Sequence, residues 1–342
     1  MTSATTPTRR RSILFWAIAA VASLHFALAF SLTLPRLWDL PTFAYANIAY
    51  PYRRRILIRG LYRLVLHFTQ SPTVPLGHGA VTTVALLNIV LAFSSVMLAV
   101  LAARLLIAQI LGRQSPFRWL SLLVVYCCSY HFLLIPENRV QFPYDLPSMA
   151  FFGLATYAAF TRNRWLYYPI FLLATFNRES TLFLPLIFLI FALREDLPLP
   201  RALRSLPLRL YAETAVQLLA WVFILHLCES LTGGPTTLPT HLRQNLHLLT
   251  NPIHWPTFLS LFGFLWIPYL LFFRRIRSPR LERCVLLAPL WAAAMFLYAD
   301  ILEIRVNSEA IVYITVCIAL ILSNTIQQRP PLTPRDALDP TP

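Results

Sequence analysis

Lysine is absent from this 342-residue chain and glycine is scarce. All 29 basic residues are arginine, and only eight glycines are spread along the length. The sequence has no glycine-rich loop of the kind that cradles nucleotide phosphates. Charge is scarce too, because charged residues make up 13% of the chain, whereas soluble domains have roughly 25%. These shortages argue against a soluble domain and against a nucleotide-binding glycine loop.

The cysteines provide neither a disulfide framework nor a metal site. They number five, show no CxxC spacing and form no cluster with histidine. All lie within apolar runs or at their ends, which predicts small buried side chains. Their positions are Cys127, Cys128, Cys228, Cys284 and Cys317.

Hydrophobic residues, in contrast, dominate the chain. They make up 57% of it, and the mean hydropathy is +0.61. The formal net charge of +15 lies in short arginine clusters between apolar runs, which is the pattern of the positive-inside rule and not of a nucleic-acid-binding protein. We therefore expect an all-α fold, a polytopic transmembrane helix bundle, in one membrane domain.

About ten apolar runs are candidates for membrane segments, some of them short or re-entrant. The shortest, 148–160, 165–176 and 181–193, have 12 or 13 residues each. A hairpin at Asn177, in place of one long helix over 165–193, would put the arginine clusters of 194–209 and 274–283 on the same side. The ten runs are 13–34, 80–108, 117–135, 148–160, 165–176, 181–193, 211–231, 257–273, 284–299 and 310–323.

The arginine distribution also predicts orientation and domain limits. Residues 1–12 form a cytoplasmic tail, 13–323 a single transmembrane domain with an outer amphipathic segment at 35–79, and 324–342 a disordered cytoplasmic tail. Both termini are then cytoplasmic, and we expect the protein in a bacterial inner (plasma) membrane. A cleaved signal peptide is the alternative for the first run, because Ala27-Leu28-Ala29 imitates a cleavage site,.

The outer segment carries an unusual row of arginines. Arg55, Arg59 and Arg63 repeat every four residues with apolar residues between them, which predicts an amphipathic helix in the plane of the lipid headgroups. Two interpretations are open. The row is either an interfacial anchor accompanied by tyrosines, or a set of guanidinium groups that holds a lipid phosphate.

Polar residues interrupt the apolar sequence at Asn177-Arg178-Glu179-Ser180. A charged group at the centre of a bilayer costs roughly 2.5 to 3.5 kcal/mol. Neighbours in a helix do not face each other, so Arg178 and Glu179 each need a partner from another segment. The candidates are Glu137, Asp145 or Glu303 for Arg178, and Arg139 or Arg305 for Glu179.

Many charged residues reach the outer side in this topology, and two arrangements are open for them. In the first, they line a polar cavity that opens outward, since irregular backbone at membrane depth is tolerated beside such a cavity. In the second, they form ion pairs that brace the loops. The residues are Asp39, Arg53, Arg54, Arg55, Glu137, Arg139, Asp145, Arg178, Glu179, Glu303, Arg305 and Glu309.

The layout resembles the GT-C class of membrane glycosyltransferases, which transfer a sugar from a polyprenyl-phosphate donor at the extracytoplasmic side. The residues that carry the resemblance are Trp38-Asp39-Leu40, Pro51-Tyr52-Arg53-Arg54-Arg55, Pro143-Tyr144-Asp145-Leu146-Pro147, Asn177-Arg178-Glu179-Ser180 and Glu303-Ile304-Arg305. The chain departs from that class in two ways. Its first outer loop has one acid instead of an acidic pair, and no soluble outer domain follows the last helix.

The resemblance implies a hexosyl- or pentosyltransferase whose partners are a lipid-linked sugar donor and membrane lipids, with no nucleic acid. Asp39 would be the general base and Asp145 a second catalytic acid that orients arginines or binds acceptor hydroxyls. The departing lipid phosphate would meet arginines. The implied substrate-binding residues are Arg53, Arg54, Arg55, Glu137, Arg139, Asn177, Arg178, Glu179, Glu303 and Arg305.

Two alternative functions accompany this prediction. The same arginines would also serve a transporter or flippase for an anionic lipid or solute, although the two halves show no internal repeat. A non-catalytic membrane subunit is the second alternative. No cofactor is assigned from the sequence, and a divalent metal bound by the single carboxylate of Asp39 is left open.

Overall fold

The computed structural model of the chain describes residues 6–35, 40–45, 52–69, 73–76, 79–135, 140–233 and 240–327. Three of the predicted site residues, Asp39, Glu137 and Arg139, lie outside these ranges. So do most of the predicted C-terminal tail and the start of the N-terminal tail. The predictions for these parts of the chain stay predictions.

Within the described residues, six helical stretches are long and apolar enough to cross a membrane, by length and composition. Three are unbroken helices: α1 (Thr6–Thr33), α4 (Thr83–Leu111) and α10 (Leu208–Thr232). The other three, Pro116–Leu134, Pro279–Tyr298 and Ile304–Ile326, join short helical turns to α5 (Leu123–Ser129), α15 (Ala288–Tyr298) and α16 (Ile311–Ile326).

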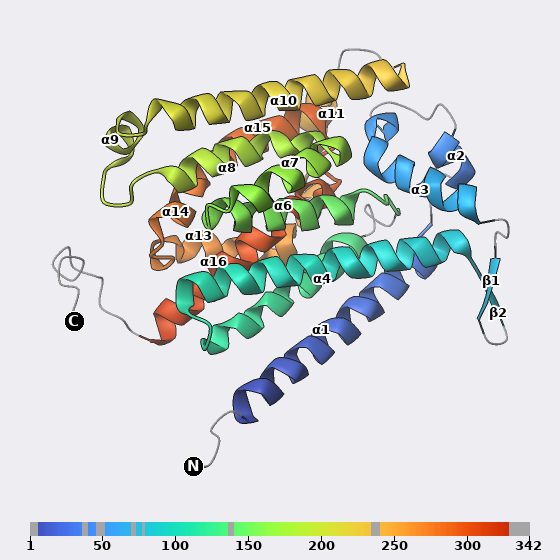
Figure 1. Cartoon of the computed structure of the whole chain (residues 1–342), viewed down its shortest axis with the longest axis horizontal. Coiled ribbons are helices and arrows are strands. Elements are labelled where there is room, and N and C mark those ends of the chain that lie inside the picture. Colours follow the sequence, from blue (N-terminus) through green and yellow to red (C-terminus); the bar gives the residue numbers. More distant parts are fainter. Residues whose placement is uncertain are drawn as a thin grey trace.

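Shorter helices fill the layer between the long ones. They are α6 (Asp145–Phe160), α7 (Arg164–Asn177) and α8 (Phe183–Ala192), and α6 packs against α4, α7 and α8 (Figure 1). At 1.5 Å per residue, the 16 residues of α6 cover about 24 Å, which is less than the roughly 30 Å hydrocarbon core. The short runs of the sequence are thus short helices in the structure.

The chain turns back between α7 and α8, as the arginine distribution predicts. Arg178 is extended (φ −159°, ψ 145°) and separates α7 from a 3-10 turn at Glu179–Leu182. One pocket is lined both by Arg164 at the start of α7 and by Ala192 at the end of α8, so the two helices run in opposite directions. The predicted hairpin is confirmed.

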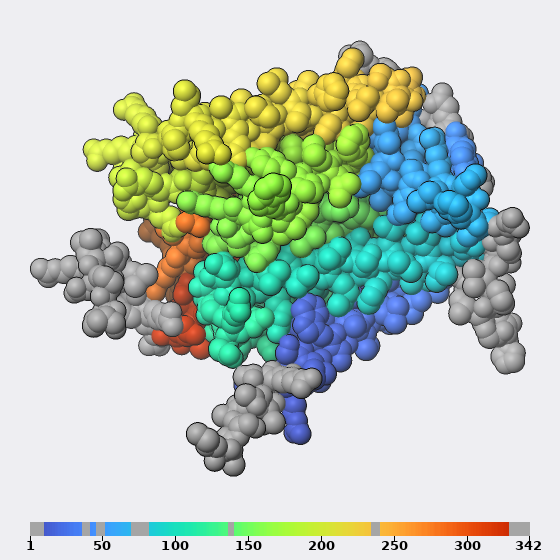
Figure 2. Space-filling view, in the orientation of Figure 1, coloured from blue at the N-terminus to red at the C-terminus, as the bar shows by residue number. Residues whose placement is uncertain are grey.

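One end of the bundle, here called the α3 end, carries the outer segment (Figure 1). It contains α2 (Leu40–Tyr45), α3 (Ile56–Phe68) and an antiparallel pair of short strands, β1 (Thr73–Leu76) and β2 (Gly79–Thr82). The predicted amphipathic helix is present as α3, which buries Ile58 and Tyr62 and exposes Leu64. Figure 2 shows α3 covering this end of the bundle beside α10.

The opposite end, here called the α9 end, collects the arginine clusters of the predicted inner side. It contains α9 (Leu199–Arg204) and α14 (Pro279–Arg283). Arg283 donates to the carbonyl of Arg194 at 2.8 Å, and Arg280 Nε lies 2.8 Å from Glu195 Oε1. Both clusters therefore meet at one end, as the hairpin requires.

The run 257–273, expected as one membrane segment, is broken in the structure. It contains α12 (Trp255–Leu259), a turn at Leu261–Phe264 and α13 (Trp266–Leu271), and α11 (Leu242–Thr250) precedes it. Phe262 and Gly263 have φ values of 55° and 61°, and His131 Nε2 accepts from the Phe262 N–H at 2.8 Å. This side-chain contact holds a kink that apolar composition did not predict.

Candidate functional site

Two acids and two arginines from separate segments form a buried network at the α3 end. Arg178 Nη1 lies 3.3 Å from Asp145 Oδ1 and 3.1 Å from Glu309 Oε1. Arg305 Nη1 donates to Asp145 Oδ2 at 2.7 Å. All four residues are at most 8% exposed. Buried charges are tolerated when opposite signs alternate and hydrogen bonds support them; the signs alternate here, and the Arg305–Asp145 pair shares a hydrogen bond.

Neutral side chains complete the network around Glu309. The hydroxyls of Ser148 and Ser180 donate to Glu309 Oε1 at 3.0 and 2.7 Å. Asn177 Nδ2 donates to the carbonyl of Tyr144 at 2.9 Å. These bonds tie the start of α6, the α7–α8 link and the turn before α16 into one unit.

Arg305 extends the network toward the surface. Its Nη2 lies 2.7 Å from Glu303 Oε2, and the Glu303 side chain is 34% exposed. The guanidinium also stacks over the Phe142 ring, 3.6 Å from the ring centre. A planar guanidinium with two acidic partners has a fixed orientation that an ammonium group would not have.

A second group of ion pairs joins the outer segment to the hairpin. Arg55 pairs with Glu179 and also reaches the carbonyl of Asn177 at 3.4 Å. Arg54 pairs with Glu229 near the end of α10 and lies 4.0 Å from Glu179. The turn at 52–54 is thereby attached to the α7–α8 link and to α10.

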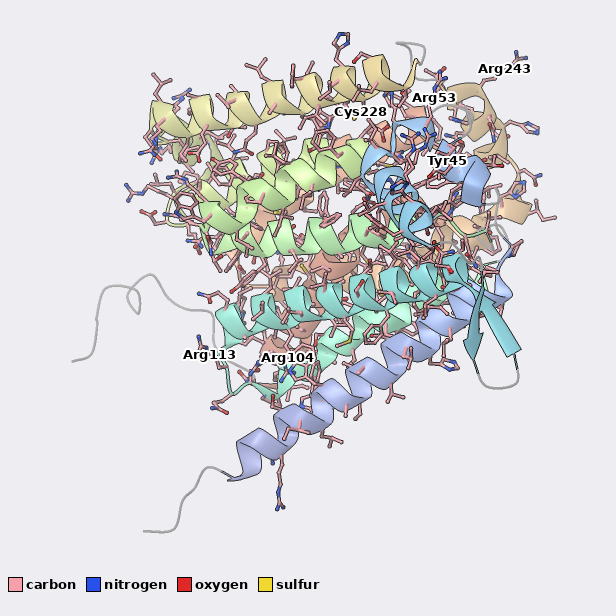
Figure 3. All side chains as sticks on the ribbon, turned by 45° about the vertical axis from the view of Figure 1, so that its right-hand side comes forward. Tyr45, Arg53, Arg104, Arg113, Cys228 and Arg243 are labelled. Carbon is pink, nitrogen blue, oxygen red and sulfur yellow. The ribbon has the colours of Figure 1, made fainter. Side chains whose placement is uncertain are left out.

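A cavity of about 370 Å³ opens beside these pairs, between α2, α3 and the end of α10; we call it the arginine pocket. Figure 3 shows Tyr45 and Arg53 at this end of the molecule, far from Arg104 and Arg113. The lining residues are Tyr45, Arg53, Ile56, Arg59, Gly60, Arg63, Leu231 and Thr232.

Arginines crowd one another in this pocket. Arg59 donates from Nε to the carbonyl of Phe43 and from Nη1 to the carbonyl of Arg53, both at 2.9 Å. Burial, followed by the charges of Arg63 and Arg53, lowers the pKa of Arg59. Arg63 donates from Nε to the carbonyl of Ala44 at 2.6 Å, and its guanidinium lies over the Tyr45 ring, 5.7 Å from the ring centre. Its terminal nitrogens have no hydrogen bond or ion pair to the described parts of the chain. The pocket thus presents positive charge to a ligand.

Tyr52 connects the arginine pocket to the buried network. Its ring stacks on Phe142 with the centres 5.6 Å apart, and Arg305 covers the same Phe142 ring. Burial, followed by the charge of Glu303, raises the pKa of Tyr52. The two charged regions are therefore neighbours around one aromatic cluster.

The structure confirms only some of the predicted ion pairs. Arg178 pairs with Asp145, one of its three predicted partners. The pairing predicted between Glu179 and Arg305 is wrong, because the turn at 52–54 brings Arg54 and Arg55 to Glu179. Arg305 instead binds Asp145 and Glu303.

The other predicted site residues fall into two groups. Among the described ones, Arg53 lines the pocket and Asn177 lies at the hairpin, while Asp39, Glu137 and Arg139 lie outside the described residues. Asp145 has both oxygens engaged by arginines, an arrangement that suits an orienting acid better than a proton acceptor.

Two acids of the networks, Glu229 and Glu309, were not predicted as catalytic or substrate-binding residues, although Glu309 was among the charges expected at the outer side. Glu309 directly precedes the last apolar run, and Glu229 lies near the end of the run at 211–231. An acid at such a position indicates a basic partner, because ionisable groups within membrane spans are costly unless they are paired. Only the three-dimensional structure identifies Arg178 and Arg54 as their partners.

Comparison with protein-family models, with curated proteins and with solved structures gives no match for this chain. The class of protein therefore follows from the fold and the site. The chain is a predominantly helical polytopic membrane protein, and its described residues include six helices of membrane-crossing length. Its distinguishing features are a paired ion network and an arginine-lined pocket at one end of the bundle.

Proposed function

We propose that the chain is an integral membrane glycosyltransferase that moves a sugar from a polyprenyl-phosphate donor to an acceptor at the α3 end. The observation that carries the proposal is the arginine pocket of about 370 Å³ beside a buried network that holds Arg178 and Arg305 in place. Fixed guanidinium groups stabilise phosphate oxygens through charge-assisted, often bidentate hydrogen bonds.

The balance of charge supports an anionic ligand. Seven arginines and five acids make up the two networks and the pocket. Among the described residues the arginines outnumber the acids by two, and by one when the proposed base Asp39 is included, so a net positive charge is left for the phosphate. The arginines are 53, 54, 55, 59, 63, 178 and 305, and the acids are 145, 179, 229, 303 and 309.

The position of α3 supports a ligand that is a lipid. An amphipathic helix with a charged face lies at the level of the headgroups, and α3 exposes Leu64 and Phe68. The pocket between α3 and Leu231 of α10 would then be open to a phosphate whose apolar tail stays in the bilayer.

The reaction would be a single displacement. Asp39, the predicted base, accepts the proton of an acceptor hydroxyl as its oxygen forms a bond to the anomeric carbon. The bond between that carbon and the phosphate oxygen breaks, and the lipid phosphate leaves with the electron pair, so the anomeric centre inverts. Arg53 and Arg63 would stabilise the leaving phosphate, and Asp145 would keep Arg178 and Arg305 oriented. A divalent metal at Asp39 remains part of the prediction for the undescribed residues.

The test is transfer of radiolabelled sugar from a polyprenyl-phosphate donor by the purified protein, scored by the mass of the product. We expect Arg63→Gln to raise the KM for the donor about tenfold, as for the loss of one charged hydrogen bond. Asp39→Asn should abolish turnover and leave donor binding intact. The matched control is Arg243→Gln, which removes one exposed arginine outside the pocket at the same end (Figure 3).

Two outcomes would count against the proposal. If neither Asp39→Asn nor Arg178→Met changed transfer, the assigned chemistry would be wrong. If the donor appeared unchanged in the other leaflet with no new product, transport would replace transfer as the function of this site.

A further inference from the structure

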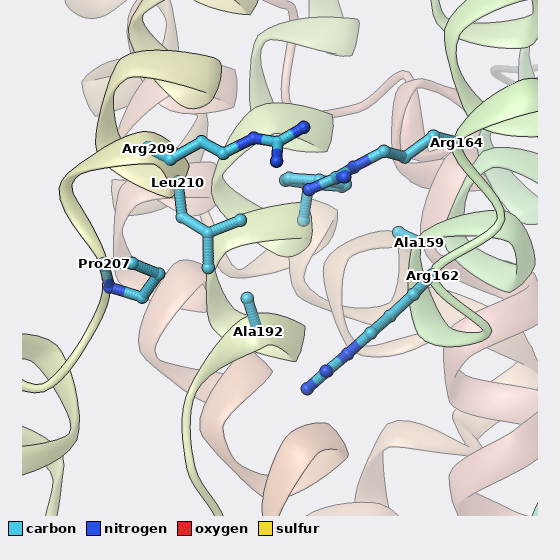
Figure 4. A pocket seen from close by; sticks show the side chains of 8 residues that line it. Ala159, Arg162, Arg164, Ala192, Pro207, Arg209 and Leu210 are labelled. Atoms are coloured by element: carbon cyan, nitrogen blue, oxygen red, sulfur yellow. The ribbon is translucent and has the colours of Figure 1, made fainter.

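A second pocket with three arginines lies at the α9 end, away from the site described above. Its volume is about 380 Å³, and it is bounded by the α6–α7 turn, the end of α8 and the start of α10 (Figure 4). We call it the α9-end pocket. Its lining residues are Ala159, Arg162, Arg164, Phe188, Ala192, Pro207, Arg209 and Leu210.

Positive charge in this pocket exceeds negative charge. Arg164 Nη2 lies 2.8 Å from Glu213 Oε2. The side chains of Arg162 and Arg209 have no ion pair or hydrogen bond to any described part of the chain. Figure 4 shows Arg164 and Arg209 projecting toward each other from opposite walls, with Arg162 entering below them. Two of the three guanidinium groups are thus available to an anion.

The backbone at Arg162 is unusual. Its φ is 56°, and it follows α6 in a helix-ending motif in which Asn163 N donates to the carbonyl of Ala158 at 2.9 Å and Arg162 N to that of Ala159 at 3.1 Å. Glycine is the usual residue at this left-handed position. The chain has arginine there, and its side chain lines the pocket.

The rest of the pocket lining is apolar. Phe188, Ala192 and Leu210 form its apolar lining. Two exposed apolar residues lie next to the pocket arginines in sequence. Trp165, which follows Arg164, is 93% exposed, and Leu208, which precedes Arg209, is 82% exposed. Exposed tryptophan beside arginine is typical of the boundary between headgroups and acyl chains.

We propose that the α9-end pocket binds the phosphate of an anionic phospholipid headgroup, in the leaflet that the α9 end faces. Arg162 and Arg209 hold the phosphate oxygens through charge-assisted hydrogen bonds, and Arg164 is kept in orientation by Glu213. The apolar lining and the exposed Trp165 and Leu208 favour a lipid over a free phosphate ion, because they would contact the glycerol and the upper acyl chains.

The test measures lipid binding to the purified full chain by native mass spectrometry, with phosphatidylglycerol, phosphatidylcholine and inorganic phosphate as separate probes. We expect phosphatidylglycerol to bind more tightly than zwitterionic phosphatidylcholine. The variant R162Q/R209Q should lower the phosphatidylglycerol affinity roughly 25-fold, about fivefold for each arginine. The control R201Q/R204Q removes two exposed arginines of α9 that do not line the pocket, and its affinity should stay within about twofold of that of the unmodified chain.

A third variant separates binding from folding. Arg162→Gly places glycine at a position whose backbone favours it, so we expect an unchanged or higher Tm together with an affinity about fivefold lower. The proposal is overturned if R162Q/R209Q binds phosphatidylglycerol like the unmodified chain, or if R201Q/R204Q loses as much affinity. Equal binding of inorganic phosphate and phosphatidylglycerol would overturn the assignment to a lipid.

Discussion

Replacing Arg178 with methionine removes a guanidinium group that lies within 3.3 Å of two buried carboxylates, those of Asp145 and Glu309. Asp145 keeps Arg305 as a partner, whereas Glu309 keeps only hydroxyl donors, Ser148 and Ser180, in the described chain. Breaking a buried pair by removing one partner costs about 3–5 kcal/mol. Because the two hydroxyls remain, we expect a loss near the lower limit, about 3 kcal/mol of unfolding free energy.

A double-mutant cycle isolates the cause of this loss. Glu309→Gln in the Arg178→Met background removes the unpaired charge and retains an oxygen that accepts from both serines. The double variant should therefore be about 2 kcal/mol more stable than the sum of the two single changes predicts. The assay is reversible unfolding in mixed micelles with increasing sodium dodecyl sulfate, followed by tryptophan fluorescence.

Arg194→Ala is the control for this cycle. Arg194 pairs with Asp196 at 2.7 Å, but both side chains are more than 60% exposed, so solvent screens the pair and no measurable change is expected. The reasoning is refuted if Arg178→Met unfolds like the unmodified chain, or if the two substitutions at 178 and 309 are simply additive.

Three further predictions concern other parts of the bundle. Arg305→Lys should lower the unfolding free energy by about 2 kcal/mol, because a single ammonium group cannot contact both Asp145 and Glu303 as the two terminal nitrogens of the guanidinium do. The same unfolding assay measures this loss. Gly153→Ala should lower the unfolding free energy by about 1–3 kcal/mol, because the new Cβ would lie 2.7 Å from Val312 Cγ2. Gly60→Ala is the control, since its new Cβ meets nothing within 4 Å, and it should raise the Tm. Equal Tm values for the two variants would contradict this account. In intact cells, a membrane-impermeant thiol reagent should label Arg243→Cys and not Arg204→Cys, and labelling of Arg204→Cys alone would reverse the proposed orientation.

Charge placement in the sequence predicts more of this structure than apolar length does. The arginine clusters predict the hairpin at Asn177 and the gathering of 194–209 with 274–283, and both are confirmed. The cost of charge in lipid also predicts that Arg178 has an acidic partner, which the structure identifies as Asp145. These inferences succeed because a charge at membrane depth has few tolerable arrangements.

Features that depend on side-chain contacts between distant segments were not predictable in the same way. The sequence does not specify that Glu179 meets Arg55 instead of Arg305, because the choice depends on how the turn at 52–54 docks on the hairpin. The kink at Phe262 depends on a bond to His131 from a different helix. The periodicity of the arginines predicts α3 but not the cavity beneath it, which requires Leu231 and Thr232 from α10.

The brevity of α7 has a consequence for the lipids around it. Its 14 residues extend about 21 Å, roughly 9 Å less than an ordinary hydrocarbon core. Leu172 and Leu173 are more than 40% exposed on its outer face, so acyl chains at that wall must shorten or tilt to match it. A polar headgroup that moves toward the hairpin would therefore cross a thinner hydrocarbon layer beside α7 than beside α4 or α10.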